Sequence, residues 1–205
     1  MKKTIICNIP MKEDVTNIAY KSDDRSLPTS EKPYRYPINS LLSQTVTQED
    51  ELKVVLLVKK DEEKFYEINA EYCRKEIEEV CKETGAKAEF VTIDTAFSQA
   101  KENHEELLGK IVDEIEVGAH VMADITYGPK DLPIVVFYAL NFAENFLDCK
   151  IDNIVYSQAT YKDNIVVSAR ICDMIPLYCL GSVTNIVNEK DPQKARQILK
   201  TLLSM

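Results

Sequence analysis

The sequence predicts an α/β fold, in which a parallel sheet is flanked by helices and ends in an antiparallel hairpin. Short apolar runs alternate along most of the chain with amphipathic segments of helical period, the pattern of repeated strand–helix units. Near the end of this alternation, a turn sequence at Tyr161–Asn164 directly precedes a further apolar strand. Two short helical segments follow. We therefore place an α/β domain at residues 1–170 and C-terminal helices at 171–205, packed on the same domain or in a dimer interface.

The first strand is expected at residues 3–9, and a long polar segment follows it up to Pro37. This segment contains the run SDDRS and several prolines. Stretches of such length without periodic structure are usually functional lids or disordered insertions. We favour a lid that covers a ligand.

The other elements are located by periodicity and by helix-end signals. Further strands are expected at residues 52–59, 88–93, 120–125, 151–157 and 165–169. Helices are expected at residues 38–45, 67–84, 105–115, 130–147, 173–188 and 191–205. The second of these helices stops at Gly85, and Asp191 caps the last one, with Pro192 in its first turn. The helix at 130–147 is apolar on more than one face, as expected for a helix between a sheet and a partner surface.

The composition indicates a globular protein and argues against binding of long nucleic acids and against a membrane span. A chain of 205 residues with 45% hydrophobic residues can bury one sizeable core. The net charge of −9 argues against a long nucleic acid bound through many phosphates. No apolar run approaches the ~20 residues of a membrane span, and the N-terminus does not resemble a signal peptide. A cytoplasmic protein with no membrane partner is expected.

Common catalytic and cofactor motifs are absent from the sequence. There is no G-x-G-x-x-G after the first strand, no G-x-S-x-G, no Walker loop and no H-E-x-x-H, so no cofactor is predicted. The six cysteines form no C-x-x-C pair and are expected to be buried reduced thiols. The two histidines lack metal-ligand spacing, so no metal is predicted. His104 is expected on a solvated helix face, and His120 is expected to be structural, at the strand end away from the ligand loops.

The most informative segment is HVMADITYGPKDLPIVVFYA, which changes from an apolar strand to a polar loop with glycine and then to a helix. In an open α/β sheet such a loop lies at the carboxyl edge, where helix N-termini favour anions. Asp124, Thr126, Gly128 and Lys130 are then candidate contacts for an anion. In the alternative interpretation, Asp124 caps the helix, Gly128 and Pro129 make a turn, and Lys130 is solvated. Three other lysines expected near strand ends are predicted to be solvated: Lys12, Lys59 and Lys60.

The run DITYGPKDLP, the apolar helix after it and the strand IDNIVYSQATY together resemble the signature of CRISPR-associated Rossmann-fold (CARF) domains. Two further segments, YRYPINSLLSQTV before the strand KVVLLVKK, and ICDMIPLYCLGSVTNIV, agree more loosely. The resemblance implies a Rossmann-like parallel sheet. The chain departs from the family at Tyr127, where histidine is common, and in the first loop, where Asn8, Ile9 and Pro10 replace the usual small hydroxyl and glycine residues.

The resemblance to a stand-alone CARF domain of type III CRISPR systems implies a homodimer that binds a cyclic oligoadenylate, most often the four-membered ring, across its two-fold axis. A ring with rotational symmetry can present equivalent phosphates to equivalent loops of two subunits. Family members usually carry an effector, often a ribonuclease, for which the C-terminal helices are too short, so an effector is expected as a fused or associated partner. The implied ligand contacts are Asn8, Ile9, Pro10, Met11, Asp124, Thr126, Tyr127, Gly128, Pro129, Lys130, Ser157, Gln158 and Tyr161.

Two functions are compatible with this resemblance. The chain is either a sensor that only binds the messenger or a ring nuclease that cleaves it without a metal, by attack of a ribose 2′-hydroxyl on the adjacent phosphate. In the second case Lys130 would stabilise charge on the phosphoryl oxygens, and Thr126 and Asn8 would orient the reacting groups. Because no histidine is expected near these loops, we predict slow cleavage or none. A metabolic α/β enzyme or nucleotide-binding protein with an unrelated ligand is a third, weaker alternative.

Overall fold

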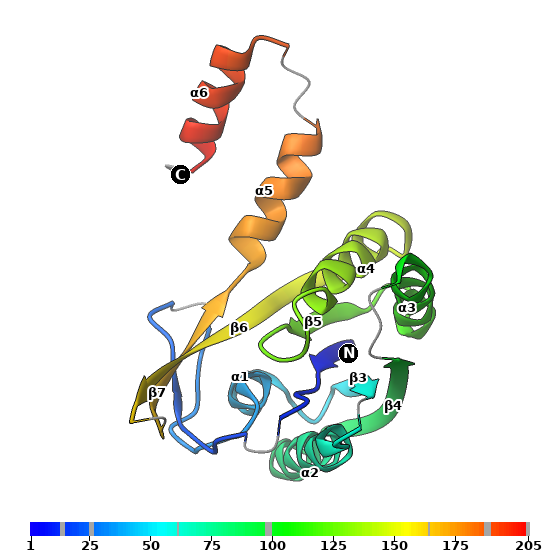
Figure 1. The fold of residues 1–205 in the computed structure, drawn as a ribbon, viewed down its shortest axis with the longest axis vertical. Coiled ribbons are helices and arrows are strands. Elements are labelled where there is room, and N and C mark those ends of the chain that lie inside the picture. Colours follow the sequence, from blue (N-terminus) through cyan, green and yellow to red (C-terminus); the bar gives the residue numbers. More distant parts are fainter. Residues whose placement is uncertain are drawn as a thin grey trace. The chain divides into compact units, whose positions relative to one another are not determined.

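A computed structural model of the chain describes residues 1–12, 15–24, 27–60, 62–96, 100–163, 165–186 and 190–203. Two compact units are present, Met1–Asp173 and Met174–Met205, and each is considered by itself. The first unit has a mostly parallel sheet with helices on both faces, and the sheet includes an antiparallel hairpin (Figure 1). The predicted fold class is thereby confirmed.

Within the described residues the sheet has seven strands, in the order β2-β7-β6-β5-β1-β3-β4. Their bounds are β1 Lys2–Asn8, β2 Tyr20–Lys21, β3 Glu51–Lys60, β4 Lys87–Ala96, β5 His120–Asp124, β6 Lys150–Lys162 and β7 Ile165–Asp173. β1 pairs in parallel with both β3 and β5, so that Ile6 is in register with Val55 and Ala123. The carboxyl ends of these three strands therefore meet at one edge of the sheet, where the sequence places the ligand loops.

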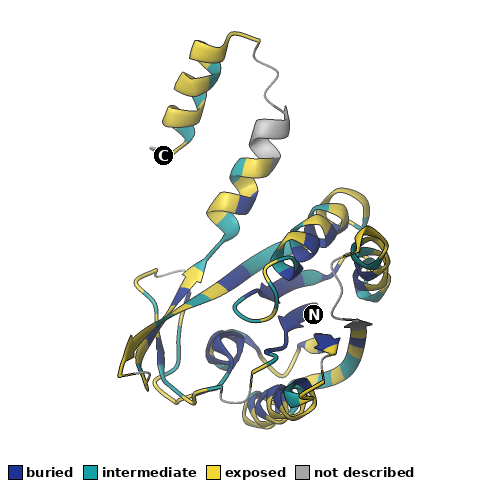
Figure 2. Cartoon of the chain, in the orientation of Figure 1, coloured by how far each residue is buried: buried dark blue, intermediate teal, exposed yellow. Residues whose placement is uncertain are grey.

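Helices pack on this sheet in two pairs, one on each face (Figure 1). α1 (Pro37–Thr45) and α2 (Phe65–Thr84) cover one face, and α3 (Lys101–Glu114) and α4 (Leu132–Phe146) cover the other. Figure 2 shows that the central strands and the helix sides facing them are buried. α2 ends before Gly85, as predicted. A φ of +81° suits glycine there, and the Gly85 N–H donates to the carbonyl of Cys81 at 2.8 Å.

The hairpin of β6 and β7 is longer than predicted. β6 continues to Lys162 and β7 to Asp173, and the two strands pair antiparallel along this length. The turn is therefore tighter than the predicted Tyr161–Asn164, because Tyr161 and Lys162 belong to β6; Asn164 lies outside the described residues. The outer ends of both strands mix polar and apolar residues, so they carry no continuous apolar signal in the sequence.

The segment at residues 10–37 was expected to be a lid. Its described part contributes a short strand and buried side chains to the first unit. β2 pairs in parallel with β7, and Ile18 and Tyr34 form an antiparallel bridge. Tyr20, Leu27 and Tyr34 are buried. A two-residue strand has no periodic pattern, and its partner β7 lies far along the chain, so sequence patterns could not indicate β2.

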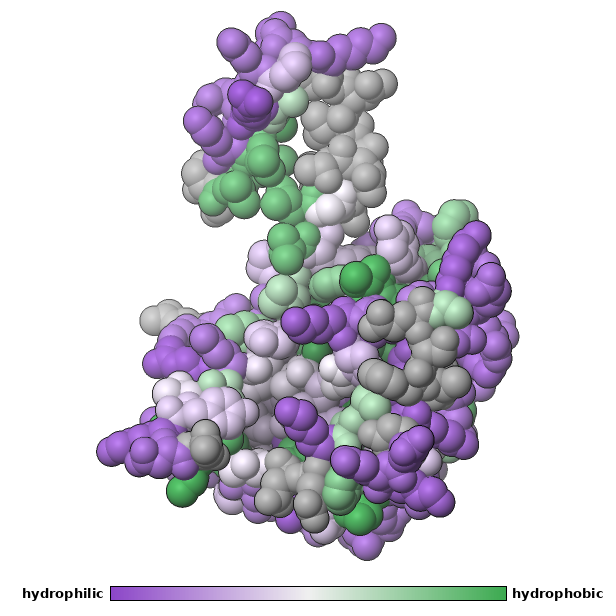
Figure 3. Space-filling model, viewed as in Figure 1, coloured by the Kyte–Doolittle hydropathy of each residue, from purple (hydrophilic) through white to green (hydrophobic). Residues whose placement is uncertain are grey.

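The second unit contains α5 (Ile175–Ile186) and α6 (Pro192–Leu202). Asp191 caps α6 as predicted, because its side chain accepts hydrogen bonds from the backbone N–H groups of Gln193 and Lys194. Figure 3 shows hydrophilic side chains on one side of α6 and apolar side chains on another. The predicted helix ends at 187–188 and 204–205 lie outside the described residues. No described helix combines the length and the apolar character needed to cross a membrane.

Candidate functional site

The loop between β5 and α4 lies at the carboxyl edge of the sheet, next to the end of β1. Gly128 in this loop has a φ of +85°, a conformation that favours glycine. A Cβ at this position would lie 2.9 Å from Leu132 Cδ2 and 3.8 Å from Asn8 Cβ. The loop therefore requires glycine at residue 128, both for its backbone angle and for its close approach to Leu132.

Asn8, the last residue of β1, is a buried polar side chain close to this glycine. It is 0% exposed, and neither its Oδ1 nor its Nδ2 has a hydrogen-bond partner among the described residues. Burial of an unpaired polar group costs about 1–3 kcal/mol. With the loop in this conformation, asparagine at position 8 therefore lowers the stability of the folded protein.

The rest of the first loop turns its side chains into the protein. Ile9 and Pro10 are buried, and Met11 is half-buried. Asn69 of α2 holds this loop through hydrogen bonds from Nδ2 to the carbonyl oxygens of Pro10 and Lys12, at 2.9 and 2.8 Å. Of the ligand contacts implied by the sequence, Ile9 and Pro10 are thus buried in the fold.

Asp124 ends β5 and is 1% exposed. Its carboxylate accepts hydrogen bonds from Thr126 N at 2.9 Å and from Ile38 N at 3.4 Å. Because Ile38 lies in the first turn of α1, Asp124 supports the N-terminus of α1, and the alternative that it caps the following helix is wrong. Burial raises the pKa of Asp124 to about 6, against the opposing effect of these hydrogen bonds.

We expect the D124N variant to lose part of the pH dependence of stability. The pKa of Asp124 is higher in the folded protein than in the unfolded chain, so the folded state binds the proton more tightly. The carboxylate therefore destabilises the fold as the pH rises from about 4 to about 6, by about 3 kcal/mol in total. Urea unfolding at about pH 4 and about pH 7 measures this contribution. Between these values the wild type should lose stability relative to D124N; parallel pH profiles would contradict the prediction.

Thr126 and Tyr127 join the loop to its neighbours. Thr126 Oγ1 accepts a hydrogen bond from Ser157 N at 3.0 Å, which ties the loop to β6. Tyr127 Oη donates to the carbonyl of Arg35 at 3.0 Å, and its ring packs edge-on against Tyr36, with the centroids 5.7 Å apart. Tyr127, at the position where the resemblance expects histidine, thus anchors the loop.

A pocket of about 830 Å³ lies beside this part of the loop. Its lining includes five of the predicted ligand contacts: Thr126, Tyr127, Ser157, Gln158 and Tyr161. Residues 15–18, from the segment at 10–37, form another part of its wall. Arg35 also lines the pocket and carries no signal in the sequence. Its guanidinium lies over the ring of Tyr72, 4.4 Å from the centroid.

The tip of the loop is accessible to solvent. Gly128 and Lys130 are exposed, and Pro129 is half-buried. Asp131 follows as the N-cap residue of α4, but its side chain makes no capping hydrogen bond. Its carboxylate is therefore available to groups from other elements.

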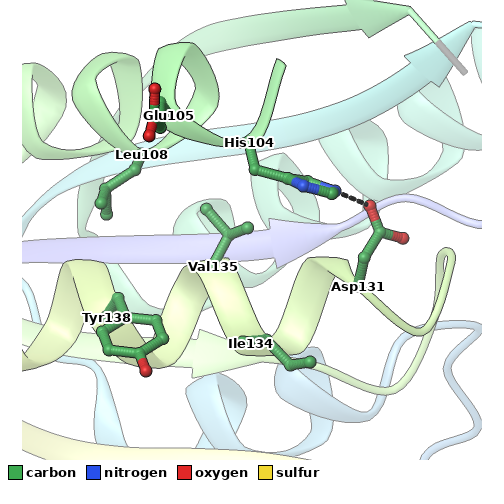
Figure 4. A pocket seen from close by; sticks show the side chains of 7 residues that line it. All are labelled: His104, Glu105, Leu108, Asp131, Ile134, Val135 and Tyr138. Carbon is green, nitrogen blue, oxygen red and sulfur yellow. Dashed lines mark hydrogen bonds and ion pairs between the residues drawn. The ribbon is translucent and has the colours of Figure 1, made fainter. Parts of the chain in front are cut away.

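Two such groups bind the Asp131 carboxylate. Oδ2 accepts hydrogen bonds from Lys59 Nζ at 3.2 Å and from His104 Nε2 at 2.9 Å; Figure 4 shows the latter contact. Lys59, near the end of β3, is 2% exposed, so the prediction that it is a solvated surface residue is wrong; Lys60 and Lys12 are exposed as predicted. Burial alone would raise the pKa of Asp131, but the hydrogen bonds from His104 and Lys59 outweigh it and hold that pKa below its usual value.

His104 also differs from its prediction. It lies in α3, its side chain is 31% exposed, and its imidazole reaches the start of α4. The predictions that His104 is solvated and that no histidine lies near these loops are therefore wrong. The contact depends on the packing of α3 against α4, which no local sequence pattern indicates. His120, as predicted, lies at the opposite edge of the sheet, where its Nδ1 contacts Asp152 Oδ2 at 2.8 Å.

A second pocket, of about 260 Å³, lies beside His104 (Figure 4). His104 and Asp131 lie at one end of it, and Leu108 and Tyr138 at the other. Its remaining lining is mostly apolar. The loop from Thr126 to Asp131 thus borders the larger pocket at its beginning and the smaller one at its end.

Four of the six cysteines are buried free thiols, as predicted: Cys7, Cys73, Cys81 and Cys149. Cys172 and Cys179 are free but exposed, so the prediction of burial is wrong for these two. Among the described residues, no three His, Cys, Asp or Glu side chains are grouped so that they could hold a metal ion.

No protein-family model matches the sequence, and no curated protein matches it either. The function is therefore inferred from the site and from the resemblance of its loops. The site combines an accessible loop tip with Lys130, a buried unpaired amide at Asn8, and a histidine bound to a carboxylate at the start of α4.

Proposed function

We propose that this chain binds a cyclic oligoadenylate, the four-membered ring in particular, and acts as a sensor in type III CRISPR antiviral signalling. The resemblance of residues 124–133 and 151–161 to CARF sequences supports the proposal. The position of the loop also supports it. The loop leads into the N-terminus of α4, whose partial positive charge favours phosphate, and it exposes Lys130 there.

The observation that carries the proposal is the unpaired amide of Asn8. It lies next to Gly128, whose left-handed backbone is tightly packed against Leu132. A ligand that displaces this loop would reach the amide and provide the hydrogen bonds that it lacks. The cost of burying Asn8 would then be offset in the bound state.

We expect the N8L variant to separate stability from binding. Leucine has the branched shape of asparagine but a larger volume, and it leaves no polar group unpaired. The gain from removing the unpaired amide should offset the cost of the larger side chain, so N8L should melt near the wild-type temperature without ligand. Binding of the ring should be weaker, because the amide is lost. Differential scanning fluorimetry with and without cyclic tetra-adenylate measures both effects. Full ring binding by N8L would show that Asn8 is not a contact.

A homodimer is part of the proposal. α4 presents four large, exposed apolar side chains at intervals of four residues: Ile134, Tyr138, Phe142 and Phe146. Exposed apolar surfaces of this kind often mark protein interfaces. A second copy of the chain is the occupant that we propose, because a two-fold axis beside α4 would bring two copies of the Lys130 loop to one symmetric ring.

Thermal unfolding with cyclic tri-, tetra- and hexa-adenylate tests the proposed function. A ligand that binds only the folded state raises Tm as its concentration exceeds Kd. We expect the largest rise with the four-membered ring. No rise with any ring would contradict the proposal and favour a metabolic α/β enzyme or another nucleotide-binding protein.

Ring cleavage is the second candidate function. The observation that favours it is the contact of His104 with Asp131, the residue after Lys130. The imidazole of His104 lies at this edge of the sheet and can act as a general base, although no histidine was expected near these loops.

A further inference from the structure

We propose that His104 is the general base of a ring-cleaving reaction and that Asp131 and Lys59 hold it in its reactive form. The inference rests on the proposed binding of a cyclic oligoadenylate and develops the second candidate function, in which that ring is a substrate. It assigns the catalytic role to His104 of α3 and positioning roles to Asp131, at the start of α4, and to Lys59, near the end of β3.

The carboxylate of Asp131 fixes the tautomer of His104. Asp131 stays ionised, since its pKa is held low and Lys59 Nζ lies 3.2 Å from Oδ2. A carboxylate can only accept, so His104 Nε2 must carry the proton in their 2.9 Å hydrogen bond. In the neutral imidazole, Nδ1 then has a free lone pair. A carboxylate that orients an imidazole in this way is a recurrent arrangement for general bases.

The placement of the imidazole also fits this reaction. His104 reaches Asp131, and the exposed Lys130 is the adjacent residue. A phosphate at the N-terminus of α4 would be near both a cation and a base. Among the described residues, Asp131 at the start of α4 contacts His104, Lys59 of β3 contacts the same Asp131 oxygen, and Glu105 of α3 lines the same pocket.

The pocket beside His104 suits a nucleoside. Its volume is about 260 Å³, and apolar side chains, among them Leu108 and Val135, line most of it. An adenine base could pack on these side chains, while His104 and Asp131 lie at the end where a ribose hydroxyl would be placed (Figure 4). The lining of the pocket thus suits the base, and the ribose would lie at its His104 end.

The proposed step consumes no water and needs no metal ion or redox partner. His104 Nδ1 accepts the proton of a ribose 2′-hydroxyl, and the 2′ oxygen forms a bond to the adjacent phosphorus. The bond from phosphorus to the 5′ oxygen of the next nucleotide breaks, and that oxygen takes a proton from solvent. The imidazolium returns its proton to solvent. The products are a 2′,3′-cyclic phosphate and a 5′-hydroxyl on an opened chain, so the atoms balance as an isomerisation.

The H104Q variant distinguishes a catalytic His104 from a purely structural one. The glutamine amide can still donate to Asp131, but it cannot act as a base. We expect the cleavage rate to fall by about 10²–10⁴-fold, with little change in Tm or in ring affinity. The acid limb of the wild-type pH–rate profile, which an imidazole base produces, should disappear. Added imidazole should restore part of the rate of H104A.

His120 provides the matched control. It is also half-buried and also contacts a carboxylate, that of Asp152, but it lies at the opposite edge of the sheet. H120N should therefore cleave at the wild-type rate. Cleavage is followed by chromatography of the products, and ring binding by thermal shift on the same samples.

The possible results separate the inference from the proposed function. Wild-type cleavage that is lost in H104Q and kept in H120N supports the inference. Binding without cleavage by the wild type overturns the inference and leaves the sensor function. Unchanged cleavage by H104Q also overturns the inference, and it leaves ring cleavage without His104 as its base. An absence of binding to any ring overturns the proposed function and, with it, the assignment of His104.

Discussion

The K59M variant is expected to be less stable than the wild type by about 3–5 kcal/mol. Lys59 is 2% exposed, and its Nζ lies 3.2 Å from Asp131 Oδ2. Methionine keeps the apolar stem of lysine, but it removes the cation from a largely buried carboxylate. The carboxylate then keeps the hydrogen bond from His104 but loses its cation, and its charge stays largely desolvated, so the loss of this buried ion pair is costly. Equilibrium unfolding in urea measures the difference.

Lys60 is the matched control for this prediction. It is the next residue in β3, it is exposed, and it pairs with Asp94 at 2.8 Å in solvent. Ion pairs of this kind contribute little to stability, so K60M should unfold at the wild-type urea concentration. The double variant K59M/D131N should recover part of the loss, because no charge then remains buried. Equal stabilities of K59M and K60M would contradict a stabilising role for the buried contact of Lys59 with Asp131.

The K130A variant is expected to bind cyclic tetra-adenylate at least about tenfold more weakly, because a charged hydrogen bond to phosphate contributes about 1.5–3 kcal/mol. A symmetric ring would lose one such contact from each subunit. Lys130 is exposed, so its removal should leave the melting temperature without ligand unchanged. Fluorescence or calorimetric titration measures the affinity.

Lys150 is the control for K130A. It is an exposed lysine at the start of β6, at the opposite edge of the sheet, and it pairs with Asp152 at 3.1 Å. K150A should bind the ring as the wild type does. Wild-type affinity in K130A, together with normal melting, would remove Lys130 and the start of α4 from the site.

Local patterns were sufficient to predict the framework of this fold. The alternation of apolar runs and amphipathic segments predicted the parallel strands and their helices. Gly85 and Asp191 marked helix ends, because glycine adopts the left-handed backbone after α2 and the Asp191 side chain accepts hydrogen bonds from the first turn of α6. β2 could not be predicted in this way. Its two residues are defined only by their pairing with Ala169 and Arg170 of β7.

The candidate site was only partly predictable for the same reason. The loop from Asp124 to Lys130 could be located, because a strand, a glycine-containing loop and a helix follow one another in the sequence. The contact of His104 and Lys59 with Asp131 could not, because each residue comes from a different element. Burial of Lys59 was also unexpected, since only its partner makes a lysine tolerable there.

Isothermal titration calorimetry of the wild-type protein with cyclic tetra-adenylate tests the central claim most directly. If two loops at the carboxyl edges of two subunits hold one symmetric ring, the titration should saturate at one ring per two chains. The stoichiometry should be the same for N8L and K130A wherever their weaker binding can still be measured. Saturation at one ring per chain would contradict the shared site, and an absence of binding heat together with an absence of thermal shift would contradict the proposed function itself.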